Sequence, residues 1–124
     1  MWQIQLGGWF NLLLCLFHLG FWKIWDWPAS LAGISGNQKA IMQVMNLHLS
    51  IALLLFAYVS IVHSQAMVST SLGKVVLGFI AAFYLIRAIN QLLFWQWDHP
   101  KSIGIAVVCV LVSLLYFIPL VPKN

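Results

Sequence analysis

The sequence has very little charge and almost no acid. Of its 124 residues, 6% are charged and 63% are hydrophobic, whereas a soluble domain typically carries about 25% charged residues. The acidic residues are Asp26 and Asp98, and there is no glutamate. This composition excludes an ordinary soluble domain and predicts a protein that lies in a lipid bilayer.

The same scarcity excludes several kinds of functional site. Two acids that lie far apart in the sequence provide no carboxylate pair for glycosidase-like chemistry and no acid for a serine triad. A glycine-rich phosphate-binding loop is absent. The basic residues do not cluster, which excludes a nucleic-acid-binding patch. They are Lys23, Lys39, Lys74, Arg87, Lys101 and Lys123.

Cysteine is scarce as well. Cys15 and Cys109 both lie inside apolar runs, where a thiol usually packs as a small hydrophobic group. No Cys-x-x-Cys pair is present, which disfavours a dithiol redox site. We therefore expect two packed, unpaired thiols.

Long apolar runs are the most prominent feature of the sequence. Four of them cover residues 9–25, 41–62, 73–95 and 103–120. Each approaches or exceeds the roughly 20 residues that a membrane-spanning helix needs. Since short connections make successive helices antiparallel neighbours, the sequence predicts an all-α membrane protein. The expected fold is an antiparallel four-helix transmembrane bundle that forms a single domain over residues 1–124.

The connections between these runs suggest a topology. The first covers Asp26 to Ala40, the second the Ser/Thr-rich stretch from His63 to Leu72, and the third a polar turn at residues 96–100. Four complete spans place both termini on one side of the membrane. Lysine and arginine are balanced between the two sides, so the orientation stays undetermined. Five tryptophans are expected to form an aromatic belt at the face opposite the termini: Trp22, Trp25, Trp27, Trp95 and Trp97.

Polar side chains form a stripe along each predicted helix when residues are placed 100° apart. Lipid offers no hydrogen bonds, so these stripes should meet in the interior and hold the helices together. His48 is an exception, because it points almost opposite to the polar residues of its own helix. The stripes contain Asn11, Cys15, His18, Trp22 and Asp26 in the first run, Gln43, Asn46 and Ser50 in the second, Tyr84, Arg87, Gln91, Trp95 and Asp98 in the third, and Ser102, Cys109, Ser113 and Tyr116 in the fourth.

Arg87 is the strongest candidate for a functional residue. It lies about 14 residues into the third run, where a charged side chain costs at least about 2.5 to 3.5 kcal/mol. Neither acid lies at this depth, so the guanidinium needs a neutral partner, water or an oxygen supplied by a ligand. The alternative is that Arg87 extends toward Asp98 and Trp97 with its stem packed in lipid.

The residues expected near Arg87 define a candidate ligand site. His18 and His48 are predicted at a similar depth, Asn90 and Gln91 could orient the guanidinium, and Tyr84 could donate to the same ligand. The sequence thus suggests an intramembrane pocket for an oxygenated or anionic amphiphile such as a quinone, fatty acid, sterol or phospholipid. Whether the protein is an enzyme is not decided by these residues.

Other functions remain open. His18 and His48 are expected to hydrogen-bond within the bundle. The alternatives are that they hold a b-type haem or join Cys15 in a weak zinc site. No metal site is favoured, and the cofactor is unknown. In a different class, the chain could be a non-catalytic accessory or assembly subunit. The unusual polar face of the second helix would then contact a membrane partner or another copy of the chain.

Overall fold

The computed structural model describes residues 1–27, 29–94 and 100–124, and most of these residues are helical. No described residue belongs to a strand, in agreement with the predicted all-α class. The elements are α1 (Trp2–Leu19), α2 (Phe21–Ile24), the 3-10 helix η1 (Ala29–Leu31), α3 (Gly36–Val62), α4 (Ser64–Ser69), α5 (Ser71–Phe94), α6 (Pro100–Phe117) and the 3-10 helix η2 (Ile118–Leu120).

Three helical segments are long and apolar enough to cross a membrane. They are Gly36–Val62, Ser71–Phe94 and Pro100–Leu120, with 27, 24 and 21 residues. This finding is consistent with an integral membrane protein. The predicted first span corresponds to α1 and α2, which are separated at Gly20. α1, with 18 residues, is not among these three segments, so a bundle of four membrane-spanning helices is not confirmed.

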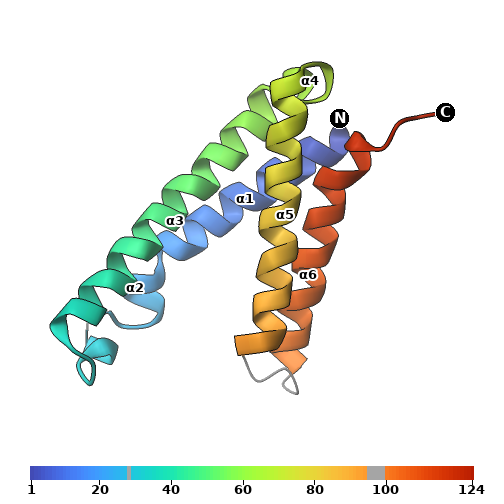
Figure 1. The fold of residues 1–124 in the computed structure, drawn as a ribbon. Helices are drawn as coiled ribbons and strands as arrows, with labels where there is room; N and C mark the ends of the chain where they lie inside the picture. Colours follow the sequence, from blue (N-terminus) through green and yellow to red (C-terminus); the bar gives the residue numbers. More distant parts are fainter. Residues whose placement is uncertain (28, 95–99) are drawn as a thin grey trace.

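The long helices are arranged as two pairs. α1 packs along α3, and α5 packs along α6 (Figure 1). The pairs meet near α4 and diverge toward the end that carries α2, so the molecule is V-shaped in Figure 1. Both termini lie at the end where the pairs meet. We refer to α1 with α3 as the first pair and to α5 with α6 as the second pair.

Local hydrogen bonds explain where two of the helices begin. The Ser35 hydroxyl accepts a bond from the Gln38 backbone N–H and starts α3 five residues before the predicted boundary. The Thr70 hydroxyl accepts from the Gly73 backbone N–H at 2.9 Å and starts α5. The second connection contains a short helix, α4, which the sequence did not predict.

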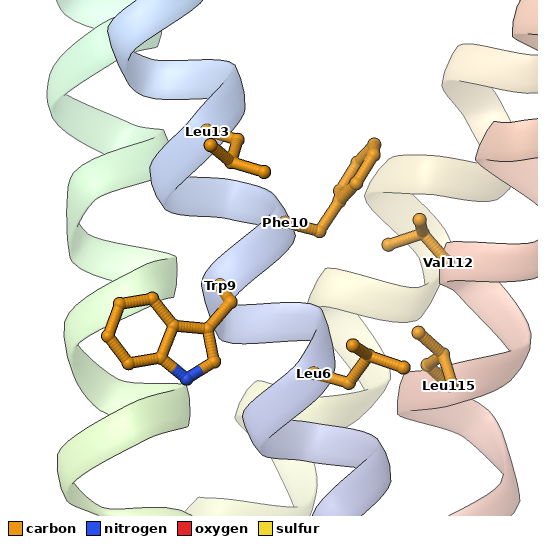
Figure 2. A pocket seen from close by; sticks show the side chains of 6 residues that line it. All are labelled: Leu6, Trp9, Phe10, Leu13, Val112 and Leu115. Atoms are coloured by element: carbon orange, nitrogen blue, oxygen red, sulfur yellow. The ribbon is translucent and has the colours of Figure 1, made fainter.

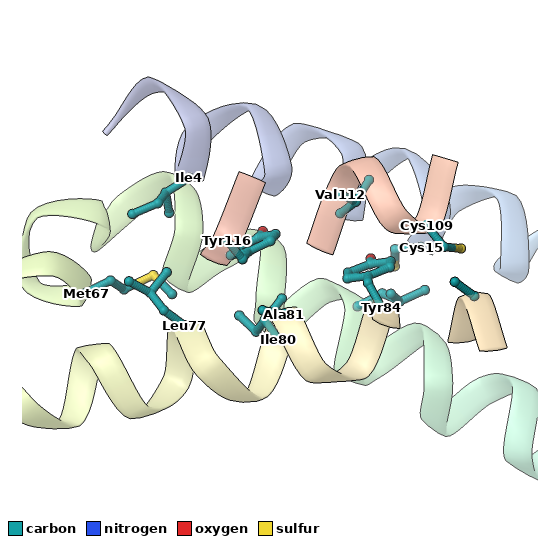
Figure 3. Packing of buried hydrophobic residues seen from close by; sticks show 12 residues of the cluster. Ile4, Cys15, Met67, Leu77, Ile80, Ala81, Tyr84, Cys109, Val112 and Tyr116 are labelled. Atoms are coloured by element: carbon teal, nitrogen blue, oxygen red, sulfur yellow. The ribbon is translucent and has the colours of Figure 1, made fainter. Parts of the chain in front are cut away.

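The buried core follows the inner faces of the long helices, as Figure 3 shows. Glycine allows close contact at three points, which are Gly7, Gly8 and Gly73. A Cβ added to Gly7 would lie 2.5 Å from the Tyr116 ring, and one added to Gly73 would collide with the backbone of Ala66 and Met67. Large apolar side chains on the outer faces are exposed, as expected of surfaces that face lipid.

Candidate functional site

A buried polar cluster joins all four long helices where the two pairs meet. The Asn11 side-chain N–H group donates to the Tyr116 hydroxyl at 2.8 Å, and the Tyr84 hydroxyl donates to the Asn11 side-chain oxygen. The hydroxyls of Ser60 and Tyr116 are also 2.8 Å apart. We call these four residues the polar node. All four are at most 1% exposed, so the node is closed to ligands and serves to hold the helices together.

Other polar bonds join the members of each pair. In the first pair, the Asn46 amide of α3 donates to the His18 carbonyl of α1 at 2.8 Å. The Trp22 indole of α2, next to this pair, donates to Gln43 of α3 at 2.9 Å. In the second pair, the Ser113 hydroxyl donates to the Ala81 carbonyl at 2.7 Å. Ser50, which the sequence placed in an interhelical stripe, bonds instead to a carbonyl of its own helix.

Arg87 lies on α5 beyond the polar node, on the side where the pairs diverge. Phe83, one turn before it on the same face, contacts Phe56 of α3 with ring centroids 5.3 Å apart. Arg87 is half-buried, and no described residue forms a hydrogen bond or an ion pair with it. Its guanidinium is close enough to the Cys109 thiol to interact with it electrostatically. The alternative partners Asp98 and Trp97 lie outside the described residues.

Gln91 provides a second unsatisfied polar group on the same face of α5, one turn after Arg87. Its side-chain N–H group donates to the Ser102 hydroxyl at 2.9 Å. Its side-chain oxygen is buried and has no hydrogen-bond partner among the described residues. A buried polar group without a partner costs about 1 to 3 kcal/mol. Gln91 is 1% exposed, so this oxygen is as closed to ligands as the polar node.

The two histidines do not form a site together. The His18 ring bonds to the Leu14 carbonyl and stacks on Phe21, with ring centroids 4.7 Å apart. Asn46 contacts His18, so its face of α3 is the one turned toward α1. His48 lies about 200° further around α3 and therefore points away from α1. His48 is exposed and bonds to the Val44 carbonyl of its own helix. A haem held between these two histidines therefore does not fit the arrangement.

The remaining predicted site residues have separate environments. Tyr84 belongs to the polar node, and Asn90 is exposed. Cys15 is buried and unpaired, and no group of three or more potential metal ligands occurs within the described part of the chain. Of the six predicted ligand-binding residues, Arg87 and Gln91 lie together on one face of α5, where Arg87 is half-buried and Gln91 is fully buried.

An apolar groove lies between the two pairs. Figure 2 shows Phe10 of α1 and Val112 of α6 facing each other across it. Its volume is about 320 Å³. Cys109, which interacts electrostatically with Arg87, comes one turn before Val112 along α6. Neither Cys109 nor Arg87 lines the groove itself. The groove is lined by Leu6, Trp9, Phe10, Leu13, Val112 and Leu115.

Sequence reasoning missed the groove and the role of Ser60. Ser60 lies on the same face of α3 as Asn46 and Ser50, so the helical period was the signal that could have identified it. The groove is lined by aliphatic and aromatic side chains, so the pattern of polar residues in the sequence could not reveal it. Comparison with known proteins adds no relative, because no family model, curated protein or solved structure matches the chain.

Proposed function

We propose that the chain is a four-span membrane protein that binds an oxygenated or anionic amphiphile between its two helix pairs. The class includes fatty acids, phospholipids, sterols and quinones. Four spans would place both termini on one side of the membrane. The observation that carries the proposal is the half-buried Arg87, which has no hydrogen bond or ion pair with any described residue.

The depth of Arg87 supports a ligand with a polar head. Arg87 is seven residues from Phe94, the last residue of α5, and hence about 10 Å inside that end of the helix. A guanidinium at this depth loses hydration and gains little from apolar neighbours. Its planar fork of N–H groups matches a carboxylate or a phosphate, which would restore the lost interactions.

The groove between α1 and α6 supports a ligand with an apolar tail. It begins about one turn from the Cys109 and Arg87 pair and extends toward the polar node. With its head at Arg87 and its tail in the groove, the ligand would lie along the helices. Its head would be nearer the end of α5 and its tail nearer the middle of the helices. A lipid in the adjacent leaflet has this same orientation, so it could enter without turning over.

The proposal can be tested by isolating the protein in a mild detergent and counting bound lipid by native mass spectrometry. The wild type should retain about one amphiphile per chain, and Arg87→Leu should lose it while still inserting into membranes. Lys74→Gln removes a charge from the exposed start of α5 and should retain the lipid. Equal retention by wild type and Arg87→Leu would contradict the proposal, as would a wild type free of lipid.

A second candidate function rests on His48. This side chain is exposed on the outward face of α3, where lipid offers it no hydrogen-bond partner. We propose as the alternative that α3 contacts a partner subunit or another copy of the chain through this face, as an accessory subunit would. Polypeptides that copurify with the wild type and not with His48→Leu would support this alternative over ligand binding.

A further inference from the structure

We infer that the preferred ligand is a fatty acid, bound as its carboxylate. This inference rests on the proposed function and adds the chemical class of the ligand. It combines the depth of Arg87 along α5 with the positions of the lysines. Within the proposed class, these two features separate fatty acids from phospholipids, sterols and quinones.

Arg87 lies deeper than the headgroups of a bilayer. α5 has 24 residues and is therefore about 36 Å long, whereas the hydrocarbon core is about 30 Å thick. Less than one turn at each end of the helix thus reaches the headgroup region. Arg87 lies seven residues before Phe94, the last residue of α5. Its backbone is therefore about two turns inside that end of the helix and within the hydrocarbon.

α6 gives a second measure of this depth. α5 and α6 pack along each other, and Phe94 and Pro100 lie at the end opposite the termini (Figure 1). Cys109, with which the Arg87 guanidinium interacts electrostatically, lies nine residues after Pro100 and hence about 13 Å inside that end of α6. Both helices thus place the charge at a similar depth, and the polar head of a ligand must reach this level.

No lysine lies at the level of Arg87. Each lysine lies outside the long helices or within the first four residues of one: Lys23, Lys39, Lys74, Lys101 and Lys123. A single cation in a low-dielectric setting favours a ligand with one negative charge, because any surplus charge would stay uncompensated. A sterol or a quinone carries no charge and would leave the guanidinium itself uncompensated.

A carboxylate reaches this level at a lower cost than a phosphodiester. A fatty acid has one polar group at the end of its chain, so only that group enters the hydrocarbon, where it pairs with the guanidinium through two parallel hydrogen bonds. A phospholipid whose phosphate sank to Arg87 would also carry its glycerol esters and its outer headgroup into the hydrocarbon. Polar groups without hydrogen-bond partners are costly there. Depth therefore favours the fatty acid.

The test compares three ligands that share an oleoyl chain. Oleate is the carboxylate, methyl oleate lacks the charge, and oleoyl lysophosphatidylglycerol carries one negative charge on a phosphodiester. Each is titrated onto the protein in a nonionic detergent, and bound ligand is counted by native mass spectrometry. The wild type should bind oleate at least about tenfold more tightly than either of the others, since a charged hydrogen bond contributes on that order.

Two variants of Arg87 separate the charge from the packing of the side chain. Arg87→Leu should bind oleate no more tightly than methyl oleate, whereas Arg87→Lys keeps the cation and should keep the preference. Lys74→Gln removes a cation near the opposite end of α5 and should bind as the wild type does. An isotope label in the oleate carboxyl gives an independent NMR readout. The carboxyl bound to the wild type should stay ionised at a lower pH than in empty micelles, because the guanidinium favours its charged form.

The possible outcomes distinguish the two claims. Equal or tighter binding of lysophosphatidylglycerol, lost in Arg87→Leu, would overturn the fatty-acid inference and leave the proposed function standing. Equal binding of oleate and methyl oleate by the wild type, lost in Arg87→Leu, would do the same. Acetate has the carboxylate without the chain, and its competition with oleate would identify a small-anion site and overturn both claims. Binding of all three ligands that does not change in Arg87→Leu would also overturn both.

Discussion

The side-chain amide of Asn11 lies 2.8 Å from the hydroxyl of Tyr116, although the two residues are 105 positions apart in the sequence. This bond joins the first long helix to the last. Asn11 also accepts from Tyr84, so one amide of the first pair holds both helices of the second pair. Beyond this level the pairs diverge, and the candidate ligand site lies on the diverging side (Figure 1).

Asn11→Ala should therefore destabilise the fold. It removes both interhelical bonds of the Asn11 side chain and leaves buried tyrosine hydroxyls short of partners. We expect the free energy of unfolding to fall by about 1 to 3 kcal/mol, measured by circular dichroism during unfolding in mixed micelles with a denaturing detergent. Asn37→Ala changes an exposed residue in the first turn of α3 and should have little effect. Identical stability of the two variants would show that the node contributes nothing.

Two helical glycines should respond oppositely to alanine. Gly73→Ala places a methyl group against the backbone of Ala66 and Met67, where neither side can move cheaply. This overpacking should cost about 1 to 3 kcal/mol. Gly104 faces open space on α6, so Gly104→Ala should be neutral or stabilise by up to about 1 kcal/mol through helix propensity. The same unfolding assay measures both, and equal effects would contradict the close contact of α4 with α5.

Helical periodicity was enough to predict part of this arrangement. The polar stripes containing Asn11, Tyr84 and Tyr116 were expected to meet in the interior, and their hydrogen bonds confirm this. Periodicity defines which face of a helix is polar, but it carries no information on the angle between helices. The close contact of Gly7 with Tyr116, which brings α1 against α6, could not be read from the sequence.

The candidate site was predictable to a similar extent. Arg87 stood out because a cation in an apolar run is costly wherever the helices pack. The grouping with His18 and His48 was inferred from similar depths along the helices, but depth does not determine which way a side chain points, and His48 points outward. The orphaned oxygen of Gln91 depends on the exact position of Ser102 across the α5 and α6 interface. Such a detail needs coordinates.

Both cysteines should be protected from labelling in the native protein. Cys15 is 3% exposed and Cys109 is 7% exposed. A membrane-permeant maleimide should label them at least about tenfold more slowly than in the unfolded chain, because burial limits access to a thiol. Reactivity can be followed by mass spectrometry. Rapid labelling of Cys109 in the native state would indicate that the pairs are further apart at this level than the structure shows.

Asn46 and Ser50 lie on the same face of α3, but substituting them should have different effects on how firmly the end of α1 is held. The Asn46 amide bonds to the last turn of α1 through the His18 carbonyl, whereas the Ser50 hydroxyl bonds within α3. Asn46→Leu should therefore loosen the end of α1, and amide hydrogen exchange around Leu19 and Gly20 should become about fivefold faster, as expected for a local loss of about 1 kcal/mol. Ser50→Ala should leave exchange in α1 unchanged. Equal exchange in both variants would mean that α1 is held to α3 by apolar packing, with no contribution from the Asn46 bond.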